Sequence, residues 1–251
     1  MLDQLKLLRG DNLYINQYIT VKNPTLNEII EYGEENYFNS IELFCLKPYD
    51  LMVQLYDSGI DYRDIDNYEV FLMLFQSALF SNDENNIHIK GLKWFIGDYN
   101  FSIYKNNQSN MNVLYDEKKN IIIDKLIYMR ISHFIKQINN IPEKNEYNLA
   151  NMSAIRLMVE DKRREYNRLK NKPKVFASLL ENIISALIWD SNCSLKINDV
   201  WDLHISQIYN GLNRISCNKN YDQIMNAIYT GNIDQKTIDV NTIHWAKKIK
   251  I

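Results

Sequence analysis

Glycine, proline and cysteine are all scarce in this 251-residue sequence. The seven glycines and four prolines are too few for Gly-rich loops, β-solenoids or long flexible linkers, and their scarcity favours helices. The three cysteines, Cys45, Cys193 and Cys217, lie far apart and include no C-x-x-C pair. This spacing predicts reduced thiols rather than a disulfide framework.

Long hydrophobic segments are missing as well. The longest unbroken apolar run, Val70–Phe75, is far shorter than the roughly 20 residues that a membrane-spanning helix needs. The first residues, MLDQLKLLRGDN, contain neither the apolar stretch nor the small-residue cleavage site of a signal peptide. The sequence therefore predicts no membrane partner and a cytoplasmic location.

Neither sign of charge is in large excess. The 29 basic and 31 acidic residues give a net charge of -2, which argues against broad electrostatic capture of DNA or anionic lipid. The densest charged block is Glu160–Lys170. One interpretation is contact with nucleic acid through Lys162, Arg163, Arg164 and Arg168, and the other is a solvated helix face. Acids interrupt the bases, so we expect the solvated face and no nucleic-acid partner.

Signatures of catalysis and of metal binding are absent from the sequence. It contains no G-x-x-x-x-G-K-[ST], G-x-G-x-x-G or G-x-S-x-G motif. An acidic run lacks the EF-hand spacing of a calcium loop and fits helix-capping aspartates better. We predict no catalytic, metal or cofactor residues and no enzymatic activity. Pairs of carboxylates that come together only in the folded chain are an alternative that the sequence leaves open. The acidic run comprises Asp57, Asp61, Asp64 and Asp66, and the histidines, none at ligand spacing, are His88, His133, His204 and His244.

Hydrophobic periodicity predicts a mainly helical chain. The stretch Pro173–Asp190 has two adjacent apolar rows at steps of four residues, which is typical of a helix buried in the centre of a core. A helix that grips a partner is the other interpretation of that stretch. A capping box of Thr25 and Glu28 predicts a helix start, and Gly33 a helix stop. Further helices are predicted at 34–46, 49–56, 68–80, 125–138, 149–170, 197–215, 221–229 and 242–251.

Short β-type runs interrupt the helical pattern between residues 82 and 124. Ile87–Ile89, Phe101–Tyr104, Val113–Tyr115 and Ile121–Ile123 are separated by Asn- and Gly-containing turn signals. They predict a small antiparallel meander over about residues 86–123, with hairpin turns at 106–110 and 116–120. We therefore expect an α+β fold in a single domain of residues 1–251, with helices arranged around residues 173–190.

Tyrosine is unusually frequent, with 17 residues. Tyrosine buries apolar surface yet keeps a polar group, and it is enriched at protein interfaces. We expect a partner-binding groove lined by Tyr56, Tyr62, Tyr68, Tyr209, Tyr221 and Tyr229.

Three segments, Asn23–Phe38, Ser58–Phe71 and Lys219–Trp245, resemble proteins encoded among the tail genes of phages and prophages of low-GC Gram-positive bacteria. That family comprises tail assembly chaperones and tail morphogenesis proteins. The resemblance implies a non-enzymatic protein that binds other tail proteins, either the tape measure or tube and baseplate subunits. It implies action in the cytoplasm of the bacterial host during assembly, or a place in the virion.

Three functions follow from this reasoning and remain to be separated. The first is a tail assembly chaperone, and the second is a structural virion component of the tail, baseplate or neck. The size of the chain and its β-rich excursion at residues 82–124 differ from the small, mainly helical chaperones, which keeps the second function open. The third is a nucleic-acid-binding or enzymatic phage protein, which a basic stripe or a convergent polar pocket in the fold would favour.

Overall fold

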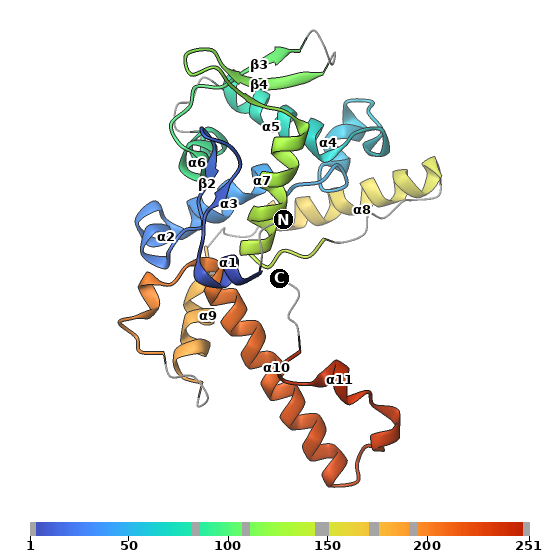
Figure 1. The fold of residues 1–251 in the computed structure, drawn as a ribbon. Coiled ribbons are helices and arrows are strands. Elements are labelled where there is room, and N and C mark those ends of the chain that lie inside the picture. The colour runs from blue at the N-terminus through green and yellow to red at the C-terminus, as the bar shows by residue number, and fades with distance from the viewer. Residues whose placement is uncertain are drawn as a thin grey trace.

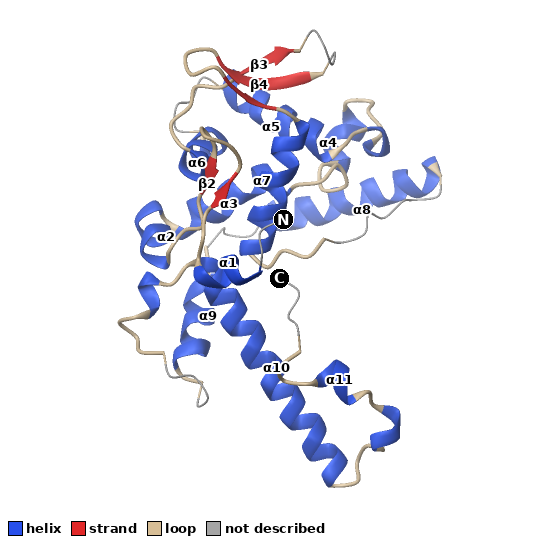
Figure 2. Ribbon diagram, viewed as in Figure 1, coloured by secondary structure: helices blue, strands red, loops and turns tan. Residues whose placement is uncertain are grey.

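A computed structural model describes residues 4–81, 86–106, 111–143, 151–170, 176–190 and 195–247. It is predominantly helical with two small antiparallel sheets, which confirms the predicted α+β class (Figures 1 and 2). In chain order the elements are α1 (Gln4–Arg9), β1 (Leu13–Tyr14), β2 (Thr20–Val21), α2 (Leu26–Tyr32), α3 (Glu34–Cys45), α4 (Met52–Asp57), the 3₁₀ turn η1 (Tyr62–Asp64), α5 (Asn67–Phe80), α6 (Ile87–Ile96), β3 (Ser102–Lys105), β4 (Asn112–Asp116), β5 (Ile121–Ile123), α7 (Lys125–Ile138), α8 (Met152–Lys170), α9 (Leu179–Ile188), η2 (Val200–Asp202), α10 (Ile205–Tyr229), η3 (Gln235–Thr237) and α11 (Val240–Ile243).

Helix α3 lies at the centre of the main hydrophobic core. It contacts α2, α5, α6 and α7, and it buries Tyr37, Ile41 and Phe44 among them. Its contact with α6 is intimate because Gly91 of α6 presents no side chain toward Ser40 of α3. The prediction that residues 173–190 form the central helix is therefore corrected, since α3 is enclosed on more sides.

Helix α9 is the part of the predicted 173–190 segment that the structure describes as helical. It begins only at Leu179, because Ser178 has a non-helical backbone and its side chain accepts a hydrogen bond from the Glu181 amide as the N-cap. Its buried residues come from both predicted apolar rows, because Ile183 and Leu187 belong to one row and Leu180 and Ile184 to the other. The first described member of each row, Leu179 and Phe176, is exposed, so α9 lies at the edge of the core.

The predicted meander is confirmed for three of its four strands. Strands β3, β4 and β5 form an antiparallel sheet in that order, and the turn at residues 116–120 joins β4 to β5. The fourth predicted strand, Ile87–Ile89, is wrong because these residues open α6. Asn86 caps that helix at the amide of His88, and α6 then buries Leu92 and Phe95 against α3 and α5. The predicted turn at 106–110 falls mostly outside the described residues.

The start of α2 forms as its sequence predicts. Thr25 accepts a hydrogen bond from the Glu28 amide, and Glu28 accepts one from the Thr25 amide, so the capping box is complete. The amide of Gly33, which has φ +92°, closes the helix on the carbonyl of Ile30. Gly33 then precedes α3 directly, and the short β1–β2 hairpin precedes α2.

Helix α10 is longer than predicted, because residues 205–229 form one continuous helix. Its first half buries Ile205, Ile208 and Tyr209 in the main core. Its second half extends away from the body and is contacted by α11 (Figure 1). Residues 197–204 form turns and η2 rather than helix, and α11 spans only Val240–Ile243 where a helix from 242 to 251 was expected. Residues 248–251 are outside the described part.

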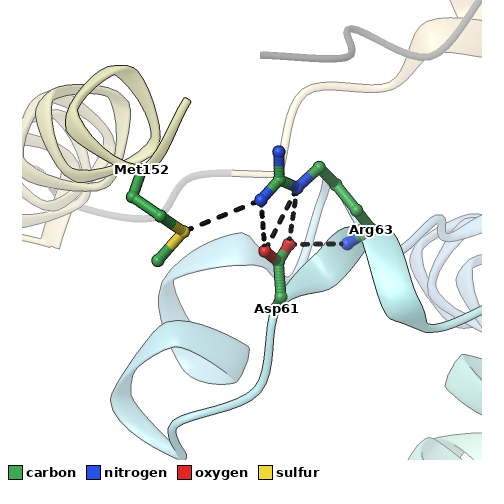
Figure 3. A network of polar contacts seen from close by, with 3 residues as sticks. All are labelled: Asp61, Arg63 and Met152. Atoms are coloured by element: carbon green, nitrogen blue, oxygen red, sulfur yellow. Dashed lines mark hydrogen bonds and ion pairs between the residues drawn. The ribbon is translucent and has the colours of Figure 1, made fainter. Parts of the chain in front are cut away.

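A second, smaller hydrophobic cluster joins α4, η1 and α8. It contains Met52, Leu55, Tyr62, Ile155 and Val159. Figure 3 shows the polar link at its edge, where the guanidinium of Arg63 binds the carboxylate of Asp61 at 2.6 Å and lies 3.7 Å from the sulfur of Met152. Within the described residues, no helix is both long and apolar enough to cross a membrane.

Candidate docking groove

An apolar groove of about 320 Å³ lies where α9 meets α2, and we call it the junction groove. Its floor is formed by buried side chains of both helices, whereas its rim is formed by exposed ones. The volume is within the range of small binding pockets. The lining residues are Leu26, Ile30, Glu34, Ser178, Leu180, Glu181, Ile184, Ser185, Ile188, Trp189, Ile197 and Trp201.

Backbone hydrogen bonds hold one side of the junction groove in place. The amide of Leu26 donates to the carbonyl of Leu203 at 3.0 Å, and the amide of Ile205 donates to the carbonyl of Pro24 at 2.8 Å. These bonds join the start of α2 to the corner between η2 and α10. The ring of His204 approaches Gly10 so closely that a Cβ on that glycine would overlap it. The corner therefore has little freedom to move relative to α2.

The other side of the groove is held by Glu34, the first residue of α3. Its Oε1 accepts hydrogen bonds from the amides of Leu179 and Leu180, both at 2.9 Å. Its Oε2 accepts one from the hydroxyl of Ser178 at 2.6 Å. A carboxylate at a helix N-terminus is stabilised by the free amides and by the helix dipole. Glu34 thus fixes α9 against the α2–α3 corner through a residue 144 positions away in sequence.

The electrostatic character of the groove is acidic. Glu34 and Glu181 are its charged lining residues, and no lysine, arginine or histidine lines it among the described residues. The negative charge of Glu34 is shared with the N-terminus of α9, whereas Glu181 is exposed at the rim. An occupant with apolar groups for the floor and a positive charge near Glu181 is complementary to this lining.

Large apolar side chains are exposed around the rim. Trp189 is 81% exposed, Ile30 55% and Ile197 54%, and Trp201 is half-buried beside them. Single exposed apolar residues are common on proteins, but a group of them around a groove is typical of an interaction site. Tryptophan is also enriched among residues that dominate binding energy. Sequence reasoning missed this rim, although the two tryptophans near α9 were its available signal.

The six tyrosines predicted to line one groove lie in separate places. Tyr62 is buried in the smaller cluster with Tyr56 half-buried beside it, and Tyr68 is buried where its hydroxyl donates to the carbonyls of Asn112 and Ile123. Burial raises the pKa of the Tyr68 hydroxyl, and it raises the pKa of the Tyr209 hydroxyl to about 12. The three buried tyrosines, Tyr62, Tyr68 and Tyr209, therefore serve the protein's own core, and the prediction of partner contact rests on Tyr56, Tyr221 and Tyr229, of which Tyr229 is 78% exposed.

Several of the other polar groups singled out in the sequence have structural partners. Asp61 caps η1 and Asp66 caps α5. Lys162 donates to the carbonyl of Tyr49 at 2.6 Å, and Arg163 pairs with Asp57. In the part of the chain that the structure describes, no group of three or more His, Cys, Asp or Glu is placed to hold a metal ion. Cys193 lies outside that part.

Comparison with known proteins gives one match. Residues 170–250 match the family described as the YomV second domain. YomV is a Bacillus prophage protein, so this part of the chain is similar to a phage-associated domain. The match begins at the last residue of α8 and takes in α9, η2 and α10. One wall of the junction groove therefore belongs to the matched region and the other to the preceding part. No curated protein and no solved structure matches the chain.

Proposed function

We propose that the protein is a non-enzymatic phage morphogenesis protein that acts by binding another phage protein in the junction groove. The observation that carries this proposal is the apolar groove with a rim of exposed Trp189, Ile30 and Ile197. Docking an apolar helix into such a groove is a common mode of protein recognition. The similarity of residues 170–250 to a phage-associated domain supports the phage setting.

The proposed partner is an apolar segment of another tail protein that carries lysine or arginine beside its apolar face. The lining supports this choice, because its charged residues are Glu34 and Glu181. Within phage assembly we propose the role of a tail assembly chaperone, which would hold the partner's apolar surface until assembly covers it. This role rests on the resemblance of the N- and C-terminal segments to tail morphogenesis proteins.

The test is co-expression of the tagged chain with the tail proteins of its own phage or prophage, followed by affinity capture at moderate salt. We expect capture of one tail protein by the wild type and at least tenfold weaker capture by Trp189→Ala. Leu126→Ala is the matched control, since Leu126 is similarly exposed but lies on α7 away from the groove. Equal capture by the wild type and Trp189→Ala would exclude the groove as the binding site. Stoichiometric presence of the protein in purified particles would contradict the chaperone role.

A further inference from the structure

A second pocket, of about 490 Å³, lies along α7 and shares no lining residue with the junction groove. Met129 and Phe134 contribute apolar surface to it, whereas Arg130, His133 and Lys136 contribute polar groups. His133 and Lys136 are three residues apart on the same helix, so their side chains lie on the same face. The pocket therefore combines an apolar wall with a group of nitrogen atoms.

Lys136 is the unusual member of this group. It is only 8% exposed, and its amine has neither an ion pair nor a hydrogen bond with any residue that the structure describes. Its charge acts on the thiol of Cys45, at the C-terminal end of α3. The partial negative charge of that helix end favours a cation beside it. It supplies no hydrogen-bond acceptor, so the amine is left with donors that a ligand can use.

Two further polar atoms of the pocket are unpartnered. His133 Nε2 and Asn67 Oδ1 are buried and form no hydrogen bond with the described residues. The other ring nitrogen of His133, Nδ1, lies 3.2 Å from a carboxylate oxygen of Glu143. The Asn67 amide can be oriented with its NH₂ group toward the pocket. A carboxylate only accepts, so the Nδ1 of His133 that faces Glu143 carries a proton, and Nε2 presents an N–H to the pocket when the ring holds both protons.

The carboxylates that line the pocket are already engaged. Asp66 binds the amine of Lys125 at 2.6 Å and the amides of Tyr68 and Glu69 as the cap of α5. Glu143 faces His133. Neither therefore neutralises Lys136, and Arg130 adds a second cation with no ion pair among the described residues. The electrostatic balance of the pocket favours an anion.

We propose that this pocket binds a small organic carboxylate with an apolar body. The carboxylate accepts hydrogen bonds from the amine of Lys136 and from Nε2 of His133, and the apolar body lies along Met129 and Phe134. This site is independent of the proposed docking function, because it shares no lining residue with the junction groove. The same chemistry is available in a free carboxylic acid and in the C-terminal residue of a peptide, and the two sources are separable by experiment.

The test is calorimetric titration of the full chain at constant ionic strength with 3-phenylpropionate and with N-acetylphenylalanine, each compared with its neutral amide, and with inorganic phosphate. We expect at least one carboxylate to bind and its amide to bind at least tenfold more weakly. Tighter binding of 3-phenylpropionate indicates a free acid as the natural ligand, and tighter binding of N-acetylphenylalanine indicates a peptide terminus. Absence of carboxylate binding, equal binding of the amides, or binding of inorganic phosphate alone would overturn the proposal.

The residue that carries the proposal is tested by Lys136→Met, which removes the charge but keeps the length of the side chain. We expect at least a tenfold loss of affinity in this variant and retention of binding in Lys136→Arg. Lys118→Met is the matched control, because Lys118 is exposed in the β4–β5 turn, and it should bind as the wild type does. Unchanged affinity in Lys136→Met would overturn the assignment. If that variant fails to fold, the amide comparison on the wild type still decides.

Discussion

Gly91 of α6 and Gly211 of α10 both lie within helices. Replacing each of them with alanine should nevertheless change the stability of the protein in opposite directions. In an open helical position, Gly→Ala stabilises a protein by about 1 kcal/mol, because alanine loses less conformational freedom on folding. A Cβ added at Gly211 of α10 would meet only the end of the Leu187 side chain, at 3.4 Å. That flexible end can move slightly, so Gly211→Ala is expected to stabilise the protein by about 0.5–1 kcal/mol.

Gly91 of α6 offers no such space. A Cβ there would lie 2.5 Å from the Cβ of Ser40 and 3.1 Å from its Cα. Ser40 cannot turn away, because it is fully buried and its hydroxyl bonds the carbonyl of Asn36 at 2.7 Å and the hydroxyl of Tyr32 at 3.0 Å. Overpacking of this kind costs about 1–3 kcal/mol, and a displaced Ser40 loses about 1 kcal/mol of hydrogen bonding. After the helix gain is subtracted, Gly91→Ala should destabilise the protein by about 1–3 kcal/mol.

The assay is urea unfolding of the wild type, Gly91→Ala, Gly211→Ala, Ser40→Gly and the double variant Ser40→Gly/Gly91→Ala. The double variant restores space between α3 and α6. Its loss of unfolding free energy should therefore be smaller than the sum of the losses in the two single variants. Equal stability changes at Gly91 and Gly211 would refute the close α3–α6 contact. Additivity of Ser40→Gly and Gly91→Ala would refute the assignment of the clash to Ser40.

Three further predictions concern single side chains. Glu34→Ala should destabilise the protein by about 1–3 kcal/mol in urea unfolding, because α9 loses three hydrogen bonds at its N-terminus. The exposed neighbour Glu35 is the control, and a similar loss of stability in Glu35→Ala would contradict the contact. The thiol of Cys45 should resist iodoacetamide at pH 8 until the protein unfolds, because burial raises its pKa to about 12; rapid alkylation of the native protein, mapped by mass spectrometry, would count against this. The amide of Asn100 donates a hydrogen bond to Asp116 and lowers the pKa of its carboxyl group. This carboxylate therefore stabilises the fold above its unfolded pKa of about 3.9, and the stabilisation is lost as the pH falls through the folded pKa. Stability should decline more steeply below pH 4 in the wild type than in Asp116→Asn, and parallel declines would exclude the effect.

Local signals in the sequence predicted local structure well. The capping box of Thr25 and Glu28 is complete in the structure, because all its hydrogen bonds are made within four residues. The strands from 102 to 123 were also visible, since each is a short β-branched run bounded by turn residues. The conformation of Ile87–Ile89 was predicted wrongly, because a run of three residues fits a strand and a helix equally well. The cap at Asn86 and the burial of Leu92 and Phe95 farther along α6 favour the helix.

The centre of the core was harder to predict than its elements. The stretch 173–190 is the more hydrophobic helix in sequence, whereas α3 carries Glu34, Glu35 and Glu42 among its twelve residues. Burial depends on how many neighbours enclose a helix, and not on its own hydrophobicity alone. Four helices enclose α3, and α9 packs chiefly on α10. Periodicity identifies the buried face of each helix, but it contains no information on which helix is surrounded.

The junction groove could not be predicted from any one stretch, because its two walls come from residues 26–34 and 178–201. No local pattern marks Ile30 as part of a rim, and its exposure depends on where α9 lies. The matched region 170–250 is also not separate from the rest of this chain. The hydroxyl of Ser206 donates to the carbonyl of Leu7 at 2.9 Å and accepts from the side-chain Nδ2 of Asn23 at 2.8 Å, both within the buried interior. A partner that contacts both walls would therefore bind only when residues 170–250 are packed against the preceding part of the chain. Since both α2 and α9 supply lining residues, neither part of the chain alone would present the complete groove.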